Sequence, residues 1–373
     1  MLAKSSGLEG VVVGDTAIST VGKEGVGLTY RGYDILDLAT HATFEEVAYL
    51  LVYGVLPTQS ELKNYQNKLV RMRRIPNELK LILETMPGTS HPMEVLRTGI
   101  SMLGTLESES NQYTDRQIAD RLIACTPSLL LYWYQFHLNN VRLNIDDSKE
   151  QSIAGYFLDL LHGEPPDDEV KRALDVSLIL YAEHELNAST FAARVTASTQ
   201  SDFYSAIVSA IGTLRGTLHG GANEEAMRLI SLFKTADQAE IGVNEMLTKR
   251  VKIMGFGHRV YKKSDPRSDI IKSWSKKLSA QAPDGYLYSV SEQIEKVMRD
   301  KKKLFPNLDF YSATTYHFCG IPTLLFTPIF VMSRLSGWSA HIFEQRENNR
   351  LIRPEANYNG PQLRQFIPIQ ERG

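Results

Sequence analysis

Residues 255–267 read Gly-Phe-Gly-His-Arg-Val-Tyr-Lys-Lys-Ser-Asp-Pro-Arg, which places a histidine on a glycine loop ahead of a helix start. Asp265 and Pro266 are typical of an N-cap and the first helical position, and apolar residues then recur at helical spacing. Arg267 would lie in the first turn, so its guanidinium can reach back toward His258. A cation there opposes the helix dipole, and this local conflict indicates that the loop handles an anionic ligand.

The complete pattern of this segment resembles the citrate synthase signature, in which glycine, an aromatic residue, glycine and histidine precede a branched apolar residue, a basic residue and Asp-Pro-Arg. The similarity covers nearly the full chain, from residues 28–34 (Leu-Thr-Tyr-Arg-Gly-Tyr-Asp) to residues 352–354 and 358–361. It implies a two-domain helical fold, with an active site in the cleft between the domains. The large domain would be formed by residues 1–220 plus 321–373, and the small one by residues 221–320.

Length and composition limit the classes of partner. The chain has 373 residues, enough for about two domains. Its net charge of −2 excludes the global positive field of nucleic-acid binders, so we expect any anion site to be a local arginine cluster. Cys125 and Cys319 lie in apolar surroundings without metal or redox spacing, which favours a cytoplasmic location. No signal peptide or membrane span is expected, because the most apolar run, residues 321–332, is short and broken by prolines.

The spacing of apolar residues after about residue 44 is helical almost throughout, which predicts an all-α protein. The start of the chain differs, because residues 11–13, 16–21 and 26–30 are short β-branched runs separated by glycines. This pattern predicts a small strand arm ahead of the helices. Residues 139–151 are polar and charged, and we expect them to form an exposed loop.

His184 follows a predicted helix that begins at Asp167 or Asp168, and it continues a stripe on one helical face that includes Tyr181. A histidine on such a face is more often a hydrogen-bonded core residue than a ligand contact. No second histidine follows four residues later, which excludes a zincin-type site. The nine histidines do not cluster at metal-ligand spacing, so we expect no metal.

His219 lies in a glycine turn between a predicted helix that begins after Asp202 and a second one with Asn223 as its N-cap. The positive end of the second helix would disfavour protonation, so the imidazole would stay neutral and still donate a hydrogen bond. The alternative is an ordinary turn histidine.

Asp309 precedes a predicted helix, a position where an aspartate is a natural N-cap. The resemblance to citrate synthases instead implies that Asp309 is the catalytic base, because the Asn-Leu-Asp of residues 307–309 matches the corresponding family segment. It further implies that His219 donates to the thioester oxygen and His258 to the keto oxygen of oxaloacetate. His184 would help to hold this substrate.

Three arginines match the oxaloacetate-binding arginines of the family: Arg267, Arg334 and Arg353. Two carboxylates on one substrate require several fork-shaped donors, a geometry that lysine does not supply. Arg334 is expected on a helix and Arg353 in the turn that follows it. In the family the last of the three comes from the other subunit, so the resemblance implies a homodimer with Arg353 contributed across the interface.

The glycine loop does not match a known phosphate-binding motif, because no P-loop is present and the third glycine of a Rossmann fingerprint is missing. The resemblance implies that coenzyme A binds to this loop and to nearby basic side chains, through Gly255, Phe256, Gly257, Arg259, Lys262 and Lys303. Lys262 is the foremost candidate for a phosphate contact. Acyl-CoA would be a substrate, so no cofactor is expected.

Within the family, the chain is most similar to the 2-methylcitrate synthases, which condense propionyl-CoA with oxaloacetate and release coenzyme A by hydrolysis. Four stretches carry this similarity, residues 30–38, 90–93, 130–134 and 182–191. Leu218 departs from the lysine that some of these enzymes have before the histidine. One alternative is a short citrate synthase that uses acetyl-CoA. Another is a non-catalytic acyl-CoA or dicarboxylate binding protein, which Asp309 argues against because a carboxylate weakens the binding of an anionic substrate.

Overall fold

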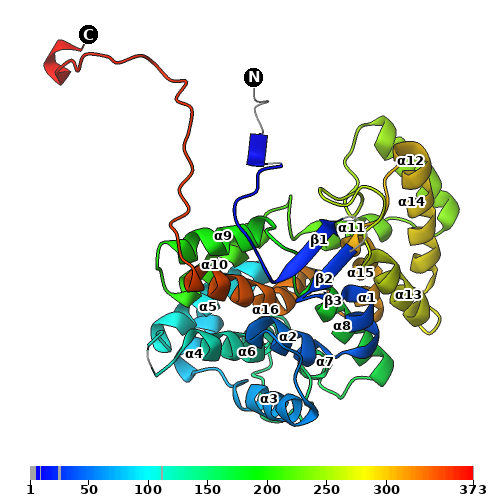
Figure 1. Ribbon diagram of the computed structural model, residues 1–373. Coiled ribbons are helices and arrows are strands. Elements are labelled where there is room, and N and C mark those ends of the chain that lie inside the picture. The colour runs from blue at the N-terminus through cyan, green and yellow to red at the C-terminus, as the bar shows by residue number, and fades with distance from the viewer. Residues whose placement is uncertain (1–5, 9, 24–26, 111, 373) are drawn as a thin grey trace.

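The computed structural model describes residues 6–8, 10–23, 27–110 and 112–372. Within these residues the chain forms 16 α-helices and one small sheet (Figure 1). This confirms the predicted all-α class with a β arm near the start of the chain. The same residues contain no helix with the length and apolar character needed to cross a lipid bilayer.

The β arm is an antiparallel sheet of three strands in the order β1 (Ser19–Lys23), β2 (Gly27–Tyr30) and β3 (Tyr33–Asp34). The predicted strand at residues 11–13 is wrong, because these residues have no regular secondary structure. Their β-branched side chains favour a strand only where a neighbouring strand pairs with them. Val26, at the start of the third predicted run, lies outside the described residues.

The helices from α1 to α10, together with the long α16, build the larger part of the molecule. Their bounds are α1 (Ile35–His41), α2 (Phe44–Tyr53), α3 (Gln59–Arg71), α4 (Asn77–Thr85), α5 (Pro92–Leu106), α6 (Asp115–Leu138), α7 (Ile153–His162), α8 (Asp168–Tyr181), α9 (Ala188–Ser198), α10 (Phe203–Leu214) and α16 (Phe326–Glu347). The predicted loop after residue 139 connects α6 to α7, and α8 has the predicted N-cap Asp167.

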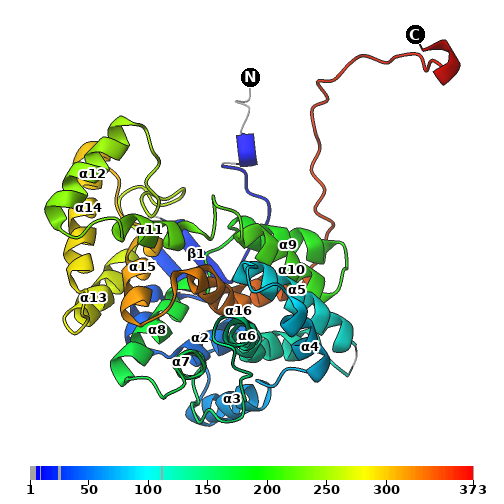
Figure 2. The same ribbon diagram turned by 180° about the vertical axis from the view of Figure 1, so that it is seen from behind.

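Helix α16 is buried along almost its whole length and packs against α2, α5, α6, α8, α9 and α10. Figures 1 and 2 show it in the middle of this group of helices. A helix that is surrounded on all sides places even its polar side chains in the interior. Arg334 is therefore buried, with 1% of its surface exposed.

The remaining helices lie together at one end of the molecule (Figure 1). They are α11 (Ala222–Ile230), α12 (Ala236–Thr248), α13 (Ser268–Ser279), α14 (Tyr286–Lys302) and α15 (Leu308–Phe318). α13 packs on α15 and α8, α11 packs on α15 and α16, and α12 packs on α14. The division into two domains at residues 220 and 320 stays a prediction.

Two predicted N-caps are wrong, each by two residues: the N-cap of α13 is Arg267 and not Asp265, and that of α11 is Gly221 and not Asn223. The N-cap of α15 is Asn307, so Asp309 does not cap this helix. Asp and Asn have similar capping preferences, so the partner that each side chain reaches decides which one caps. Oδ1 of Asn307 accepts the backbone N–H of Asp309 at 3.1 Å. The carboxylate of Asp309 is therefore available for another role.

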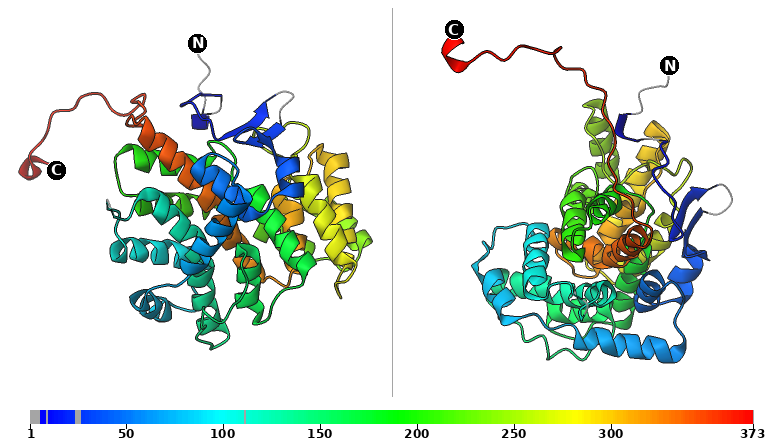
Figure 3. Two further views of the ribbon diagram at one scale, coloured as in Figure 1. Left: turned by 60° about the horizontal axis from the view of Figure 1, so that its bottom comes forward. Right: turned by 60° about the vertical axis from the view of Figure 1, so that its left-hand side comes forward.

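The last described residues, 351–372, form a largely exposed segment that extends away from the helices in both views of Figure 3. Arg353 is exposed in this extended chain and does not lie in the predicted turn. The described part of the chain also contains three short 3-10 helices: η1 (Ser6–Leu8), η2 (Thr323–Leu325) and η3 (Ile369–Glu371).

Candidate active site

A cleft of about 1010 Å³ lies between α16 and the α8–α9 connection on one side and the loop before α13 on the other. Six of the seven residues predicted for catalysis and oxaloacetate binding line it: His184, His219, His258, Arg267, Asp309 and Arg334. The seventh, Arg353, lies in the exposed tail. Chain segments that are far apart in sequence thus meet at one site.

Two glycines shape the loop that carries His258. Gly255 and Gly257 have φ angles of +87° and +74°, in the left-handed region that favours glycine. A Cβ atom on Gly255 would also come within 3.0 Å of the Cβ of Phe310. Asn307 binds this loop twice, because its backbone N–H donates to Gly255 O at 2.9 Å and its Nδ2 donates to Gly257 O at 3.0 Å. The loop and the start of α15 therefore form one unit.

His258 has a defined tautomer. Its Nδ1 accepts hydrogen bonds from the backbone N–H of Val260 at 3.0 Å and of Tyr261 at 3.2 Å. Because a backbone N–H only donates, we assign the lone pair to Nδ1 and the proton to Nε2. Burial, reinforced by the positive charge of Arg267, lowers the pKa of His258 to about 4. The imidazole is neutral at pH 7 and keeps its Nε2–H for a ligand.

His219 is also neutral, mainly because it is buried. The helix whose first turn binds its ring is α9, and not α11 as predicted. Nε2 of His219 accepts the backbone N–H of Ser189, in the first turn of α9, at 3.3 Å and lies 2.9 Å from Ser189 Oγ. This contact assigns the proton of His219 to Nδ1. Burial, and then the charge of Arg334, lower the pKa of His219 to about 4. The positive end of α9 acts in the same direction.

His184 does not lie on the predicted helical stripe, because α8 ends at Tyr181. It is buried in the connection to α9, where its Nε2 lies 3.2 Å from the hydroxyl of Tyr261. The ring centroids of His184 and His258 are 5.0 Å apart. Burial and the charge of Arg267 hold the pKa of His184 well below its ordinary value. All three histidines of the cleft are therefore neutral.

Asp309 faces the cleft from the first turn of α15. Its Oδ1 accepts a hydrogen bond from the hydroxyl of Tyr181 at 2.7 Å. Burial raises the pKa of Asp309 to about 6, against the opposing effects of this hydrogen bond and of Arg267. Its carboxylate is a stronger base than that of an exposed aspartate, and it is mostly ionised at pH 7.

Arg267 and Arg334 are held in different ways. Arg267 forms a two-pronged pair with Asp265, from Nε to Oδ1 at 2.9 Å and from Nη2 to Oδ2 at 2.8 Å. Burial would raise the pKa of Asp265, but the charge and hydrogen bonds of Arg267 hold it below its ordinary value. Arg334 donates from Nε to Tyr181 O at 2.6 Å, while its Nη1 is buried without a hydrogen-bond partner. Such an unpaired donor is suited to a substrate carboxylate.

Four of the six residues predicted to bind coenzyme A line the cleft: Gly255, Phe256, Gly257 and Arg259. Lys262 and Lys303 do not line it. Nζ of Lys262 donates to Arg259 O at 2.9 Å, within its own loop. Lys303 ends α14 with a φ angle of +57°.

The sequence did not identify several residues of the cleft. Phe330 lies one turn before Arg334 on α16, with its ring centroid 4.7 Å from the guanidinium carbon and 4.4 Å from the ring of Tyr181. The four-residue spacing of the pair on one helix was the available signal. Residues 10–14 also line the cleft, although they had been predicted in part as a strand.

The chain is similar to known proteins in both sequence and fold. Residues 7–355 match the family model described as citrate synthase, C-terminal domain. The chain is 55% identical to the 2-methylcitrate synthase of Shewanella oneidensis over 98% of each chain. It is 44% identical to citrate synthase 2 of Bacillus subtilis over the full length of both. A ternary complex of carboxymethyl coenzyme A and oxaloacetate with the citrate synthase of Thermoplasma acidophilum has a TM-score of 0.90, at 34% identity and 98% coverage of both chains.

Proposed function

The chain belongs to the citrate synthase family of condensing enzymes, and on this premise we propose that it is a 2-methylcitrate synthase. It would condense propionyl-CoA with oxaloacetate and release coenzyme A. The 2-methylcitrate synthase of Shewanella oneidensis supports this assignment, because its identity of 55% exceeds the 44% of citrate synthase 2 from Bacillus subtilis. The non-catalytic binding protein does not fit a family of enzymes.

In the first step, Asp309 removes a proton from the carbon beside the thioester carbonyl, and the electron pair moves onto the thioester oxygen. His219 donates its Nδ1–H to this oxygen, where negative charge develops. The pKa of about 6 makes the Asp309 carboxylate basic while keeping it ionised at neutral pH. The hydroxyl of Tyr181 orients it.

In the second step, the enolate carbon attacks the keto carbon of oxaloacetate, and a carbon–carbon bond forms. The former keto oxygen takes the Nε2 proton of His258 and becomes a hydroxyl group, and the proton that Asp309 removed in the first step replaces it on His258 by way of solvent. His258 polarises this oxygen through its Nε2–H, and His184 helps to hold the substrate. Arg267 and Arg334 bind the carboxylates, with Arg353 of a second subunit as the third donor.

In the last step, water attacks the thioester carbonyl and the carbon–sulfur bond breaks. The product keeps the new carboxylate, and coenzyme A leaves as the free thiol. We assign coenzyme A to residues 255–257 and Arg259. Lys262 and Lys303 are proposed phosphate contacts, which a change in loop conformation would bring to the cleft.

The exposed tail supports a homodimer. Tyr358, Leu363 and Phe366 are exposed apolar residues on an extended segment, and apolar surface of this kind marks a site of contact with another molecule. A second copy of the chain would cover it. Arg353 lies outside the cleft of its own chain, which fits a contribution to the cleft of the partner.

One observation carries the proposal: the cleft joins a carboxylate of raised pKa with two neutral histidines that each keep one N–H for a ligand. The test is to incubate the protein with oxaloacetate and propionyl-CoA, to follow free thiol continuously, and to identify the product by mass. We expect many turnovers per site and no thiol release without oxaloacetate. Stoichiometric binding without thiol release would contradict the proposal.

A citrate synthase that uses acetyl-CoA is the second candidate. The full-length similarity to citrate synthase 2 of Bacillus subtilis favours it. The two thioesters differ by one methyl group, which is worth only about 1 to 3 kcal/mol in a fitted pocket. We therefore expect activity on both thioesters, with a preference for propionyl-CoA.

A further inference from the structure

Two buried side chains of opposite charge, one of which lines the cleft, each leave one atom unpaired. Nη1 of Arg334 and Oε2 of Glu183 have no hydrogen-bond partner. Arg334 is 1% exposed and Glu183 is 0% exposed. An unpaired charged atom in the interior is costly, and most buried polar groups in proteins are paired. Two such atoms beside one site therefore require an explanation.

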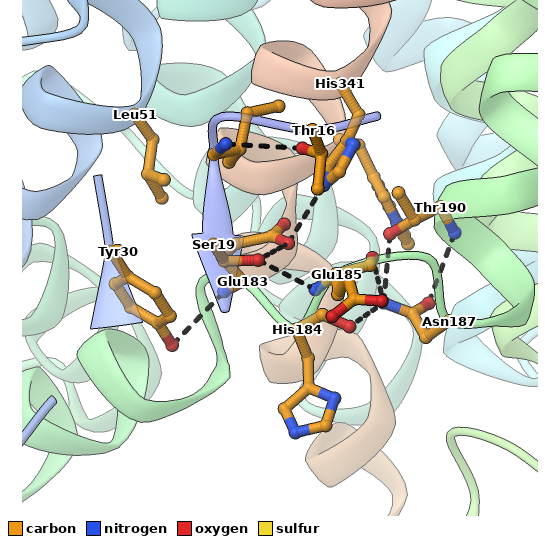
Figure 4. Close-up of polar contacts among 12 residues, drawn as sticks. Thr16, Ser19, Tyr30, Leu51, Glu183, His184, Glu185, Asn187, Thr190 and His341 are labelled. Carbon is orange, nitrogen blue, oxygen red and sulfur yellow. Dashed lines mark hydrogen bonds and ion pairs between the residues drawn. The ribbon is translucent and has the colours of Figure 1, made fainter. Parts of the chain in front are cut away.

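The other oxygen of Glu183 is firmly held. Oε1 accepts hydrogen bonds from Ser19 Oγ and His341 Nε2, both at 2.9 Å (Figure 4). His341 Nδ1 lies 3.1 Å from Nη1 of Arg194, and a guanidinium only donates, so Nε2 of His341 donates the hydrogen bond to Glu183. Burial would raise the pKa of Glu183, but His341 and Arg334 hold it below its ordinary value, so the carboxylate is ionised. In Figure 4 the imidazole of His184 is turned away from these bonds.

A glycine in α16 makes room for the free oxygen. A Cβ atom on Gly337 would lie 2.4 Å from Oε2 of Glu183 and 2.3 Å from Ala182 O. Glycine in the middle of a helix is destabilising, so its presence here points to a packing need. Gly337 follows Arg334 by three residues and lies on the same face of α16. The carboxylate of Glu183 can therefore approach the face of α16 that carries Arg334.

The two charges act on each other without a direct bond. No ion pair joins Arg334 to Glu183 in the part of the chain that the structure describes. Burial lowers the pKa of Arg334 to about 10, and the charge of Glu183 opposes this shift. Arg267 is different, because Asp265 occupies two of its nitrogens. Arg334 thus receives electrostatic support but keeps Nη1 unoccupied.

We infer that Glu183 is the resting counter-ion of Arg334, which stabilises the buried guanidinium in the empty cleft and leaves Nη1 for a substrate carboxylate. This inference rests on the proposed function, in which Arg334 binds oxaloacetate. Glu183 is a positioning residue, because it acts through Arg334. The carboxylate of oxaloacetate takes over its role, so the charge of Glu183 opposes oxaloacetate binding.

The test uses Glu183→Gln, which removes the charge and keeps an acceptor for Ser19 and His341. We expect lower thermal stability and higher affinity for oxaloacetate. The free protein loses thermal stability, because the charge of Arg334 is left without its partner. Oxaloacetate binds about threefold more tightly or better, because the site becomes one unit more positive for a dianion. The readouts are the Kd of oxaloacetate by calorimetry, the Tm with and without oxaloacetate, and separate kcat and KM values.

Two controls separate charge from structure. Glu344→Gln removes a carboxylate at the far end of the same chain of bonds, where it accepts from Arg194 at 2.6 Å. It should lower the Tm without tightening oxaloacetate binding. Glu183→Asp keeps the charge and should bind oxaloacetate with nearly the wild-type Kd. Equal or weaker binding of oxaloacetate to folded Glu183→Gln would overturn the inference. A wild-type protein that does not bind oxaloacetate would overturn the proposed function instead.

A double variant keeps the inference testable if Glu183→Gln does not fold. Glu183→Gln combined with Arg334→Met removes both charges, and removal of a complete buried pair is far less destabilising than removal of one member. The double variant should recover most of the lost Tm, or recover folding. A double variant no more stable than Glu183→Gln alone would overturn the inference.

Discussion

Asp309 is available as a base because Asn307 takes the N-cap of α15 in its place. Asp309→Asn keeps the shape of the side chain but removes the basic carboxylate. We expect turnover to fall about a hundredfold or more, with Tm and oxaloacetate binding close to wild type. Steady-state thiol release and calorimetry check this. Near-normal turnover of a folded Asp309→Asn protein would rule out the base assignment.

The pH dependence of activity follows from the same carboxylate. Its pKa of about 6 predicts that kcat/KM rises with pH through this value, because only the ionised form accepts a proton. His219 and His258, with pKa values lowered to about 4, stay neutral over this range and add no further step. Because the pKa of Asp309 is raised in the folded protein, the protonated carboxyl group contributes to the free energy of unfolding at low pH, and this contribution is lost as pH rises through about 6. The measurement is a kcat/KM profile for wild type and Asp309→Asn. Persistence of the step in the variant would assign it to another group.

Asn307 connects helix α15 with the glycine loop, since it caps the helix and also binds Gly257 O through Nδ2 at 3.0 Å. Asn307→Ala should lower the free energy of unfolding by about 1 kcal/mol, because α15 loses its N-cap. It should also lower kcat, because the loop that carries His258 loses its anchor. Asp202→Ala is the matched control, because Asp202 caps α10 by accepting from Ser205 N at 2.9 Å. Equal kinetic effects of the two variants would contradict the connecting role.

The helical pattern predicted the fold class, because it depends on local sequence, whereas most residues of the cleft were predicted only from the resemblance to citrate synthases. Gly255 and Gly257 have positive φ angles that few other residues adopt. The N-cap predicted at Asp265 is wrong, and a distant partner also binds its carboxylate. The carboxylate of Asp265 binds Arg267 and also accepts the N–H of Leu308, 43 residues later. Spacing along one chain contains no information on such a contact.

The contacts of Glu183 and the position of the tail could not be predicted from the sequence either. Glu183 precedes His184 in the resembling segment, but its bonds to Ser19 and His341 join residues separated by 164 and 158 positions. The tail was predicted to form a turn at Arg353, and the single chain instead leaves it exposed. Its conformation in the proposed dimer depends on a surface of the partner.

The assembly of the complete enzyme is predicted to require two chains. If Arg353 contributes to the cleft of the partner, each site depends on Asp309 of its own chain and on Arg353 of the other chain. Arg353→Ala and Asp309→Asn then each inactivate both sites of a dimer that contains only that variant. A mixed dimer of the two variants contains one site with both residues intact. We expect mixing under conditions of subunit exchange to restore part of the activity. Each mixed dimer should reach up to about half of the wild-type activity, because one of its two symmetry-related sites is intact. Full activity of a verified monomer would contradict this.

The cleft is lined by residues of α15 and of the loop before α13 as well as by Arg334 of α16, and we predict that α11–α15 close onto the larger part of the molecule. We predict that oxaloacetate binds first and drives this closure, which prevents hydrolysis of the thioester without an acceptor. Oxaloacetate should raise the affinity for propionyl-CoA, as measured by calorimetry with Asp309→Asn. The same thioester affinity with and without oxaloacetate would contradict ordered closure.

The choice of acyl group decides the proposed function most directly. The measurement is kcat/KM of the wild-type enzyme for propionyl-CoA and for acetyl-CoA at saturating oxaloacetate. We predict a higher value for propionyl-CoA with measurable activity on acetyl-CoA, since one methyl group supplies about 1 to 3 kcal/mol of discrimination. A clear preference for acetyl-CoA would contradict the assignment as a 2-methylcitrate synthase and would identify the protein as a citrate synthase.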